Sequence, residues 1–301
     1  RKKLLDRKNN PIYKHTEMEM FLAERDGELV GRIAAIKNNL HNQYHKDKVG
    51  FFGFFECIDD QEVANALLDK VREWLKSRDC DAMRGPANPS SNDEWGMLLE
   101  GFDDEPRLLM TYNPKYYLDL CENYGLKKIK DLYAYKISNE KILKSEKLKR
   151  VAEIAAKRSG LKIVQLNMKN FRQEIDKVKY VYNKAWAPNW GFVPLTEEEL
   201  DAMAKDLKQI VEPSLVLFGE VDGKVIGFSL VMLDYNAIFK EMNGRLFPFN
   251  FLKLWTKKKN IKWVRIITLG LVPEYQKRGL DSVFYWEIVN RAEKLGIYLG
   301  E

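Results

Sequence analysis

The sequence has little cysteine, and it has no long hydrophobic run. Its three cysteines, Cys57, Cys80 and Cys121, are odd in number and widely spaced. This argues against a disulfide framework and predicts a reducing, cytoplasmic environment. The cysteines also lack the spacing of metal ligands, so we expect no metal site. No apolar stretch approaches the roughly 18 residues that a membrane span requires, and no signal peptide is visible, so we expect no membrane partner.

The composition is that of a soluble globular protein. With 301 residues, 45% of them hydrophobic and 31% charged, the chain can bury one large core or two ordinary ones. The net charge is +6, but the lysines are scattered, with small clusters at 127–130 and 257–259. Such clusters are more typical of solvated faces than of a nucleic-acid footprint, so we expect no nucleic-acid partner.

One stretch near the C-terminal end has the pattern of an anion-binding site. Residues 264–272 are apolar and β-branched, which predicts a buried strand, and Pro273 ends it. Gln276 to Gly279 forms a basic turn, and a helix is predicted from Leu280 to about Leu295. The first amides of a helix have no partner inside it, and the helix dipole favours negative charge there. The turn therefore predicts binding of a phosphate or pyrophosphate.

The same stretch resembles motif A of the GNAT acetyltransferase superfamily, in which a strand ending in V-x-P is followed by Q/R-x-x-G-x-G/A opening a helix. Leu271, Val272 and Pro273 stand at the place of V-x-P. The resemblance implies that the turn amides hold the pyrophosphate of acetyl-CoA and that the splayed strand holds pantetheine. The cofactor-binding residues implied are Leu269, Leu271, Val272, Gln276, Lys277, Arg278, Gly279, Leu280 and Asp281. Asp281 departs from the pattern, because its carboxylate stands beside the expected pyrophosphate.

The two halves of the chain share an order of elements. Residues 24–33 and 220–229 each read as a hairpin with an Asp-Gly turn, and a strand and a helix follow each hairpin. We therefore expect an α/β fold with mixed sheets, made of two tandem GNAT-like domains. The domains expected are 1–140, a connecting helix over 141–160, and 161–301. In the family a helix and two strands follow the fifth strand, here Ile297 to Glu301, and we expect these to be missing from the second domain.

The first domain is expected to bind no cofactor. After Cys57 its turn carries Asp59, Asp60 and Glu62 and has no glycine. An acidic turn repels pyrophosphate.

The resemblance implies acetyl transfer from acetyl-CoA to an amine acceptor, either a small molecule or a peptide. The candidate bases are Glu220 and Glu301, and the candidate acceptor-binding residues are Asn189, Trp190 and Phe192. The three histidines, His15, His41 and His45, lie near no other motif and are expected at the surface. A second interpretation stays open, in which both halves have lost cofactor binding and the protein is a GNAT-fold interaction module. The oligomeric state is not determined by the sequence.

Overall fold

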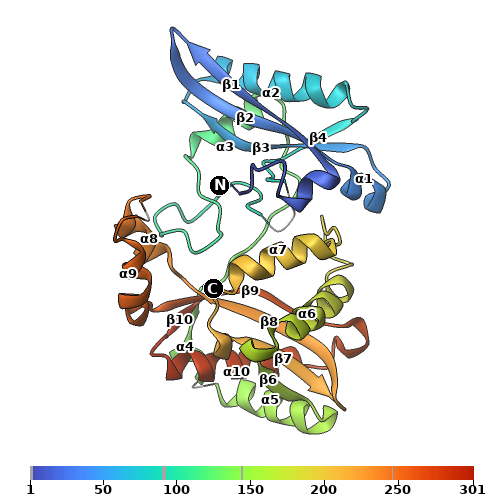
Figure 1. Ribbon diagram of the computed structural model, residues 1–301, viewed down its shortest axis with the longest axis vertical. Helices are drawn as coiled ribbons and strands as arrows, with labels where there is room; N and C mark the ends of the chain where they lie inside the picture. Colours follow the sequence, from blue (N-terminus) through green and yellow to red (C-terminus); the bar gives the residue numbers. More distant parts are fainter. Residues whose placement is uncertain (1–2, 90–92, 144, 246) are drawn as a thin grey trace. The chain divides into compact units, whose positions relative to one another are not determined.

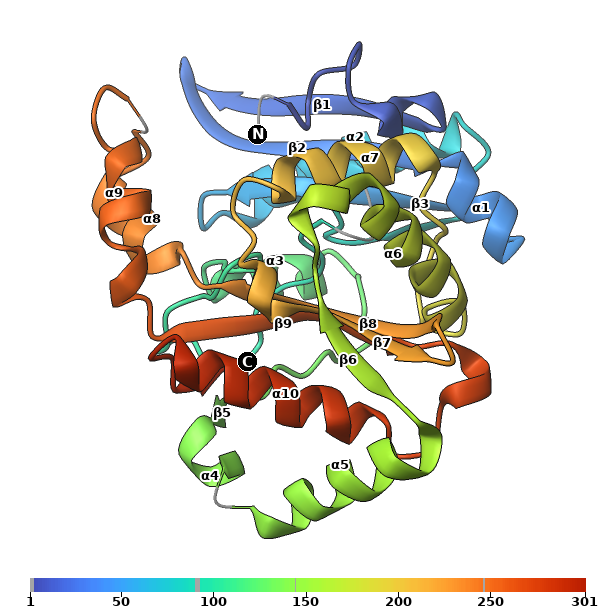
Figure 2. The ribbon, with the colours of Figure 1, turned by 60° about the horizontal axis from the view of Figure 1, so that its bottom comes forward.

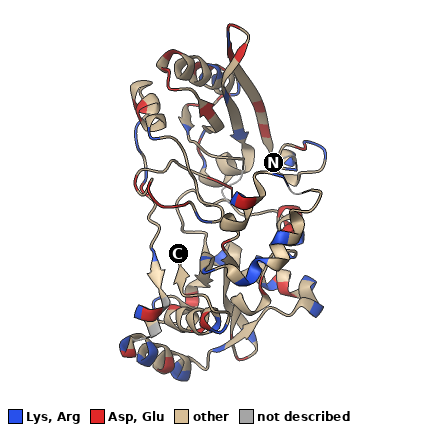
Figure 3. Cartoon of the chain, turned by 90° about the vertical axis from the view of Figure 1, so that its left-hand side faces the viewer, with Lys and Arg blue, Asp and Glu red and all other residues tan. Residues whose placement is uncertain are grey.

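The computed structural model describes residues 3–89, 93–143, 145–245 and 247–301 and divides the chain into two compact units (Figure 1). The first unit is Arg1–Leu132 and the second is Tyr133–Glu301. Lys and Arg are interspersed with Asp and Glu along the ribbon (Figure 3). None of the helices in the described ranges has the length and apolar character needed to cross a membrane.

The first unit is built on a four-stranded sheet with the order β1-β2-β3-β4. β1 to β3 are antiparallel, and β4 is parallel to β3 because α2 carries the chain from one to the other. The strands are β1 (Thr16–Arg25), β2 (Glu28–Asn38), β3 (Val49–Cys57) and β4 (Ala82–Arg84). The helices are η1 (Pro11–Lys14), α1 (Asn39–His45), α2 (Gln61–Lys76) and α3 (Tyr116–Asn123).

The helix α2 forms where apolar residues recur at helical spacing after an N-cap. The side chain of Asp60 accepts a hydrogen bond from the amide of Val63 at 3.1 Å, which satisfies one of the first helical donors. The buried face of α2 is made of Val63, Ala64, Leu67, Leu68, Val71 and Leu75. This face packs against the sheet in a core that includes Ile33, Phe52 and Phe55.

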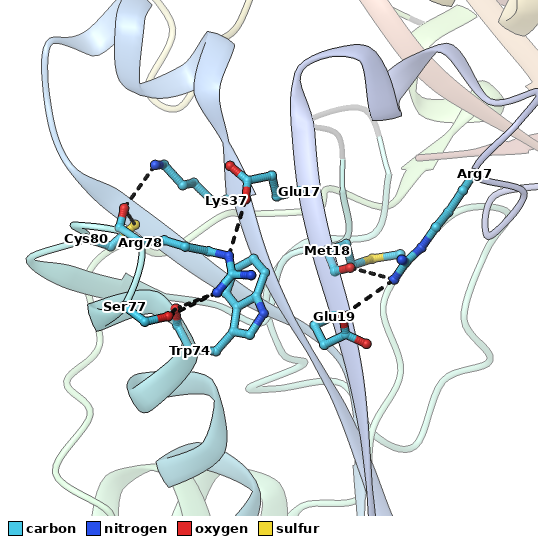
Figure 4. Close-up of polar contacts among 9 residues, drawn as sticks. All are labelled: Arg7, Glu17, Met18, Glu19, Lys37, Trp74, Ser77, Arg78 and Cys80. Carbon is cyan, nitrogen blue, oxygen red and sulfur yellow. Dashed lines mark hydrogen bonds and ion pairs between the residues drawn. The ribbon is translucent and has the colours of Figure 1, made fainter.

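Arg78 holds the end of α2 against the first two strands (Figure 4). Its guanidinium lies 3.7 Å from the ring centroid of Trp74 and donates to Glu17 of β1 at 3.2 Å. Lys37 of β2 donates to the Arg78 carbonyl at 2.9 Å. These contacts tie the C-terminal end of the helix to the hairpin.

His41 corrects an expectation for this unit. Its side chain is only 2% exposed, whereas we expected the histidines at the surface. Burial lowers the pKa of His41 to about 4, although nearby Asp47 acts in the opposite direction. His41 packs edge-on against Phe51, with ring centroids 4.9 Å apart. It is therefore a neutral core residue at ordinary pH.

The second unit is built on a six-stranded sheet with the order β5-β10-β9-β8-β7-β6. Of the neighbouring strand pairs that the described residues form in this sheet, β9 and β10 are parallel because α10 connects them, and the others are antiparallel. The strands are β5 (Ile137–Ser138), β6 (Lys162–Gln165), β7 (Val216–Val221), β8 (Lys224–Leu233), β9 (Trp263–Leu271) and β10 (Leu299–Gly300). The α-helices are α4 (Asn139–Leu143), α5 (Glu146–Ser159), α6 (Phe171–Ala185), α7 (Glu197–Leu207), α8 (Asn236–Met242), α9 (Phe251–Thr256) and α10 (Asp281–Lys294). The 3₁₀ turns are η2 (Met168–Asn170), η3 (Pro213–Leu215), η4 (Lys258–Asn260) and η5 (Pro273–Tyr275).

Helices cover both faces of this sheet (Figure 2). α6 and α7 lie on one face, and α5 and α10 lie on the other. α5 occupies most of the region in which we expected a connecting helix, but it belongs to the second unit. Its Ala152 and Ala155 are buried in the core of that unit. The domain boundaries expected from the sequence stay a prediction.

The order of elements predicted for both halves is present in the two sheets. The Asp26-Gly27 turn joins β1 to β2, and the Asp222-Gly223 turn joins β7 to β8. All four turn residues have positive φ, between 49° and 82°, as a two-residue hairpin turn requires. The strand after each hairpin leads into a helix and then a parallel strand, β3-α2-β4 in the first unit and β9-α10-β10 in the second.

Candidate functional site

The site is organised by the strand β9, whose course changes at a bulge. β10 pairs with the first part of β9, where the Ile266 amide donates to the Glu301 carbonyl at 2.7 Å. On the other side, Val231 of β8 pairs with Ile266 and Leu230 pairs with Thr268, so Ile267 is the extra residue. A bulge of this kind bends and twists a strand and redirects its backbone groups.

Beyond the bulge, two backbone amides of β9 point away from β8. The amide of Val272 donates to the Ile226 carbonyl of β8 at 2.9 Å. Because backbone groups alternate along an antiparallel ladder, the amides and carbonyls of Leu269 and Leu271 are directed to the opposite side. The Leu271 carbonyl accepts a hydrogen bond there from the side-chain amide of Gln276 at 2.8 Å.

The turn after β9 has the backbone of an anion-binding loop. Lys277 and Gly279 both have positive φ, at 58° and 73°. The first bonds of α10 come from the amides of Ser282 and Val283, which donate to Gly279 and Leu280. The amides of Gly279, Leu280 and Asp281 therefore lie ahead of the intrahelical bonds, and α10 has no side-chain cap. This leaves a helix N-terminus available to an anion.

A cavity of about 300 Å³ lies between the end of α6, the end of β9 and this turn. Its lining residues are Ala185, Trp186, Asn189, Leu269, Gly270, Leu271, Gln276, Lys277 and Asp281. The indole of Trp186 forms one wall of the cavity. It lies directly against β9, because a Cβ added at Gly270 would be only 2.3 Å from its ring. Trp186 also stacks on Tyr182, with ring centroids 5.1 Å apart. The absence of a side chain at Gly270 is what lets the indole lie against the strand.

The structure brings together six of the predicted site residues. The residues that line the cavity are Asn189, Leu269, Leu271, Gln276, Lys277 and Asp281. Val272 and Leu280 are buried in the core instead. Arg278 is exposed, and its guanidinium lies 5.2 Å from the ring centroid of Tyr275. Of these two neighbouring basic residues, Lys277 is the one that lines the cavity. A Cβ added at Gly279 would meet only Val151, at 4.0 Å, so a side chain would fit there. Glycine is favoured at this position because of its positive φ, which residues with a side chain rarely adopt.

Asp281 lines the cavity with an exposed side chain. It is the first residue of α10, where a carboxylate interacts favourably with the helix dipole, but it does not cap the helix. The pKa of Tyr285, which lies one turn further along α10, is raised mainly by burial and to a smaller extent by the negative charge of Asp281. The cavity therefore carries one carboxylate and one ammonium group, Asp281 and Lys277.

The two predicted bases lie outside the cavity lining. Glu220 forms an ion pair with Lys177 at 3.1 Å, and Lys177 also pairs with the buried Glu174 at 3.0 Å. Glu301 lies 4.0 Å from Arg265, whose pKa is lowered by burial and held up by Glu301 and Asp234. A role for either glutamate as a base stays a prediction.

The aromatic loop after α6 is divided between the cavity and the core. Asn189 lines the cavity, Trp190 is exposed outside it, and Phe192 is buried against Tyr182 with ring centroids 5.7 Å apart. Phe192 is thus placed as a packing residue. Trp186 and Gly270 also shape the cavity but were not among the residues predicted from the sequence. Their one sequence signal is the position of Trp186 at the end of an amphipathic helix before Pro188.

The corresponding turn in the first unit is organised around carboxylates. Asp60 caps α2 and pairs with Arg25 at 2.8 Å, and Arg25 also pairs with Glu62 at 3.0 Å. The helix start that is available in the second unit is therefore taken by a side-chain carboxylate in the first. Among the described residues, no group of three or more His, Cys, Asp or Glu side chains could hold a metal.

Comparisons with known proteins agree with this architecture. No family model matches the chain. One similar solved structure is a fungal multi-domain β-N-acetylglucosaminidase that contains a GCN5-related glucosamine N-acetyltransferase region. The superposition covers 98% of this chain and 31% of that protein, with a TM-score of 0.54 and 12% sequence identity. The fold is thus GNAT-like.

Two curated proteins are similar in sequence. One, named "Bacterial ceramide synthase" and found in Caulobacter vibrioides, is 36% identical over 97% of this chain and 77% of its own length. The other, "Protein YghO" of Escherichia coli, is 32% identical over 91% of this chain and 70% of its own length. The chain therefore belongs to the family that includes the Caulobacter bacterial ceramide synthase and YghO.

Proposed function

We propose that the chain is an acyl-CoA-dependent N-acyltransferase whose acceptor is a long-chain amine. The observation that carries the proposal is the cavity at the end of β9, where an uncapped helix N-terminus, Lys277 and the outward amide of Leu269 lie together. The name of the Caulobacter relative supplies the acceptor class, because a ceramide is an amide formed between a fatty acyl group and a long-chain amino alcohol. The proposed acyl donor is an acyl-CoA, a class whose short-chain member is the acetyl-CoA expected from the sequence.

The proposed reaction forms a C–N bond and breaks a C–S bond. The free amine attacks the thioester carbonyl, the negative charge gathers on the carbonyl oxygen, and the thiolate leaves. The Leu269 amide is directed to the open side of β9 and would donate to that oxygen. The turn amides and Lys277 would hold the pyrophosphate, and Trp186 would bound the channel for the pantetheine arm. The ammonium proton goes to a base, and a proton returns to the leaving thiolate; Glu220 and Glu301 remain the candidate bases.

The test combines binding with product analysis on the 301-residue chain. Calorimetry with free CoA should show micromolar binding, and Lys277→Glu should abolish it. Mass spectrometry after incubation with palmitoyl-CoA and sphinganine should detect the N-acyl product, in greater yield than with acetyl-CoA. If millimolar CoA gives no heat with the wild-type chain and no amide forms, the enzyme proposal is wrong.

One observation favours a second candidate function, a GNAT-fold interaction module. The carboxylate of Asp281 lines the cavity where a pyrophosphate would bind, and like charges weaken binding. In that case CoA should fail to bind both the wild-type chain and Asp281→Asn. Binding that appears only in Asp281→Asn would show that this carboxylate has disabled the site.

For the first unit we propose that no CoA binds, since Asp60 and Arg25 occupy the start of α2. Calorimetry on the whole chain tests this through the stoichiometry. We expect one CoA per chain, and no residual binding in Lys277→Glu. A second equivalent of CoA that survives Lys277→Glu would contradict the proposal.

A further inference from the structure

The connection between β8 and β9 is much longer than the pairing of these strands requires. The two strands are antiparallel neighbours, and Leu233 at the end of β8 pairs with Val264 at the start of β9. Adjacent antiparallel strands are commonly joined by two to five residues. Here the chain runs through α8, α9 and η4, and we call residues 236–262 the α8–α9 insertion. Figure 2 shows α8 and α9, in orange, standing clear of the helices that cover the sheet.

The insertion is folded and anchored by its own contacts. Ile238 and Met242 are buried in the core of the second unit, and Leu254 packs against that core. The side chain of Asn250 donates to the Arg245 carbonyl at 2.7 Å, and Lys253 donates to the Glu241 carbonyl at 3.0 Å. The side chains on the outer side are therefore presented by an ordered element.

Those outer side chains are aromatic. Phe247, Phe249 and Trp255 are 73%, 73% and 75% exposed, and Phe239 and Leu252 are also exposed. Phe247, Phe251 and Trp255 follow one another at four-residue spacing, with ring centroids 5.9 and 6.4 Å apart. Large aromatic side chains gathered on a surface in this way mark an interaction site, because leaving them in water is unfavourable.

The insertion also carries the charge excess of the protein. It contains seven basic residues and one acidic residue, a net charge of +6, which equals the formal net charge of the whole chain. Lys257 and Lys258 pair with Glu241 and Glu212. Arg245 and Lys259 are exposed, and within the described residues neither has an ion-pair partner. The aromatic surface is therefore bordered by cationic groups.

We propose that the α8–α9 insertion docks the protein on an anionic lipid bilayer. Short helices that present aromatic side chains bordered by lysines bind at the membrane interface, where the rings enter the boundary of the acyl chains and the ammonium groups meet phosphate. This proposal replaces the expectation of no membrane partner. It does not depend on the proposed reaction, because the insertion precedes β9 whereas the cavity lies at the end of that strand.

The test is sedimentation of the 301-residue chain with vesicles that lack acyl-CoA and acceptor. Vesicles of phosphatidylcholine with about 30% phosphatidylglycerol should bind the chain at least about tenfold more tightly than pure phosphatidylcholine. Phe249→Ser/Trp255→Ser should lower binding about tenfold, and Arg245→Gln/Lys259→Gln should remove most of the preference for the anionic lipid. Tyr298→Ser, which removes an aromatic ring that is 51% exposed outside the insertion, is the matched control and should bind like the wild type.

Brominated lipid gives an independent readout of insertion. It should quench tryptophan fluorescence in the wild-type chain and quench less in Trp255→Phe, which keeps an aromatic ring and should keep vesicle binding. The proposal is overturned if the wild type does not sediment with anionic vesicles, or if the paired aromatic substitution leaves sedimentation unchanged. It is also overturned if that substitution only converts a dimer into a monomer, since the surface would then be a contact between copies of the chain.

Discussion

The side-chain amide of Gln276 donates to the Leu271 carbonyl at 2.8 Å, so the turn before α10 is fastened to the end of β9. We expect Gln276→Leu to lower the free energy of unfolding by about 1 kcal/mol and to weaken CoA binding more than that, because the turn amides lose their alignment. Thermal unfolding and calorimetry measure the two effects. Gln209→Leu, an exposed glutamine in the same unit, should change neither.

Lys277 and Arg278 differ in what they face. Lys277 lines the cavity, whereas Arg278 lies over Tyr275. Lys277→Ala should therefore weaken CoA binding by about 1.5 kcal/mol or more, as expected for a lost charge-assisted hydrogen bond, and Arg278→Ala should have a smaller effect. Calorimetry at one ionic strength compares the two. A larger loss from Arg278→Ala would show that the exposed guanidinium turns to the ligand.

The positive φ of 58° at Lys277 is unfavourable for a residue with a side chain. Lys277→Gly should raise the free energy of unfolding by up to about 1 kcal/mol while removing the cationic group from the cavity. Stability and CoA affinity should thus change in opposite directions. If Lys277→Gly is less stable than Lys277→Ala, the turn does not have the described conformation.

Asp281 places a negative charge at the proposed pyrophosphate site. Asp281→Asn keeps the size of the side chain and should tighten CoA binding several-fold, with a weaker effect at high salt because exposed charges are screened. Glu293→Gln makes the same change of charge near the other end of α10 and is the control. If both substitutions tighten binding equally, the effect comes from net charge and not from the cavity.

His41 predicts a pH dependence of stability. Its pKa is lowered from 6.5 to about 4 in the folded chain, so between these values the unfolded chain binds more protons than the folded one. The stabilisation by neutral His41 is complete above about pH 6.5 and is lost as the pH falls towards 4. We expect a loss of roughly 2 kcal/mol over this window, allowing for screening by solvent. Urea unfolding across the window measures it. His41→Gln should flatten the profile and His45→Gln should not; an unchanged profile in His41→Gln would assign the titration to another group.

Local signals in the sequence determined much of the secondary structure. The spacing of Thr196 and Glu199 in the sequence is that of a capping box, and the two residues form one at the start of α7, with backbone-to-side-chain bonds of 3.3 and 2.9 Å. The two Asp-Gly turns and the basic turn before α10 also lie where the sequence predicts them. Caps and tight turns are readable because their hydrogen bonds join residues only a few positions apart.

The tertiary structure decided which of these elements meet. Trp186 reaches the cavity because Gly270, far along the chain, has no side chain, and neither residue carries a local signal of this contact. In the same way, burial of Ala152 and Ala155 makes α5 part of the second core, and burial of His41 keeps it neutral. Phe192 packs in the core and Asn189 lines the cavity, although they are three residues apart in one loop. Burial depends on segments brought together from distant parts of the chain, so the pattern of any single segment does not specify it.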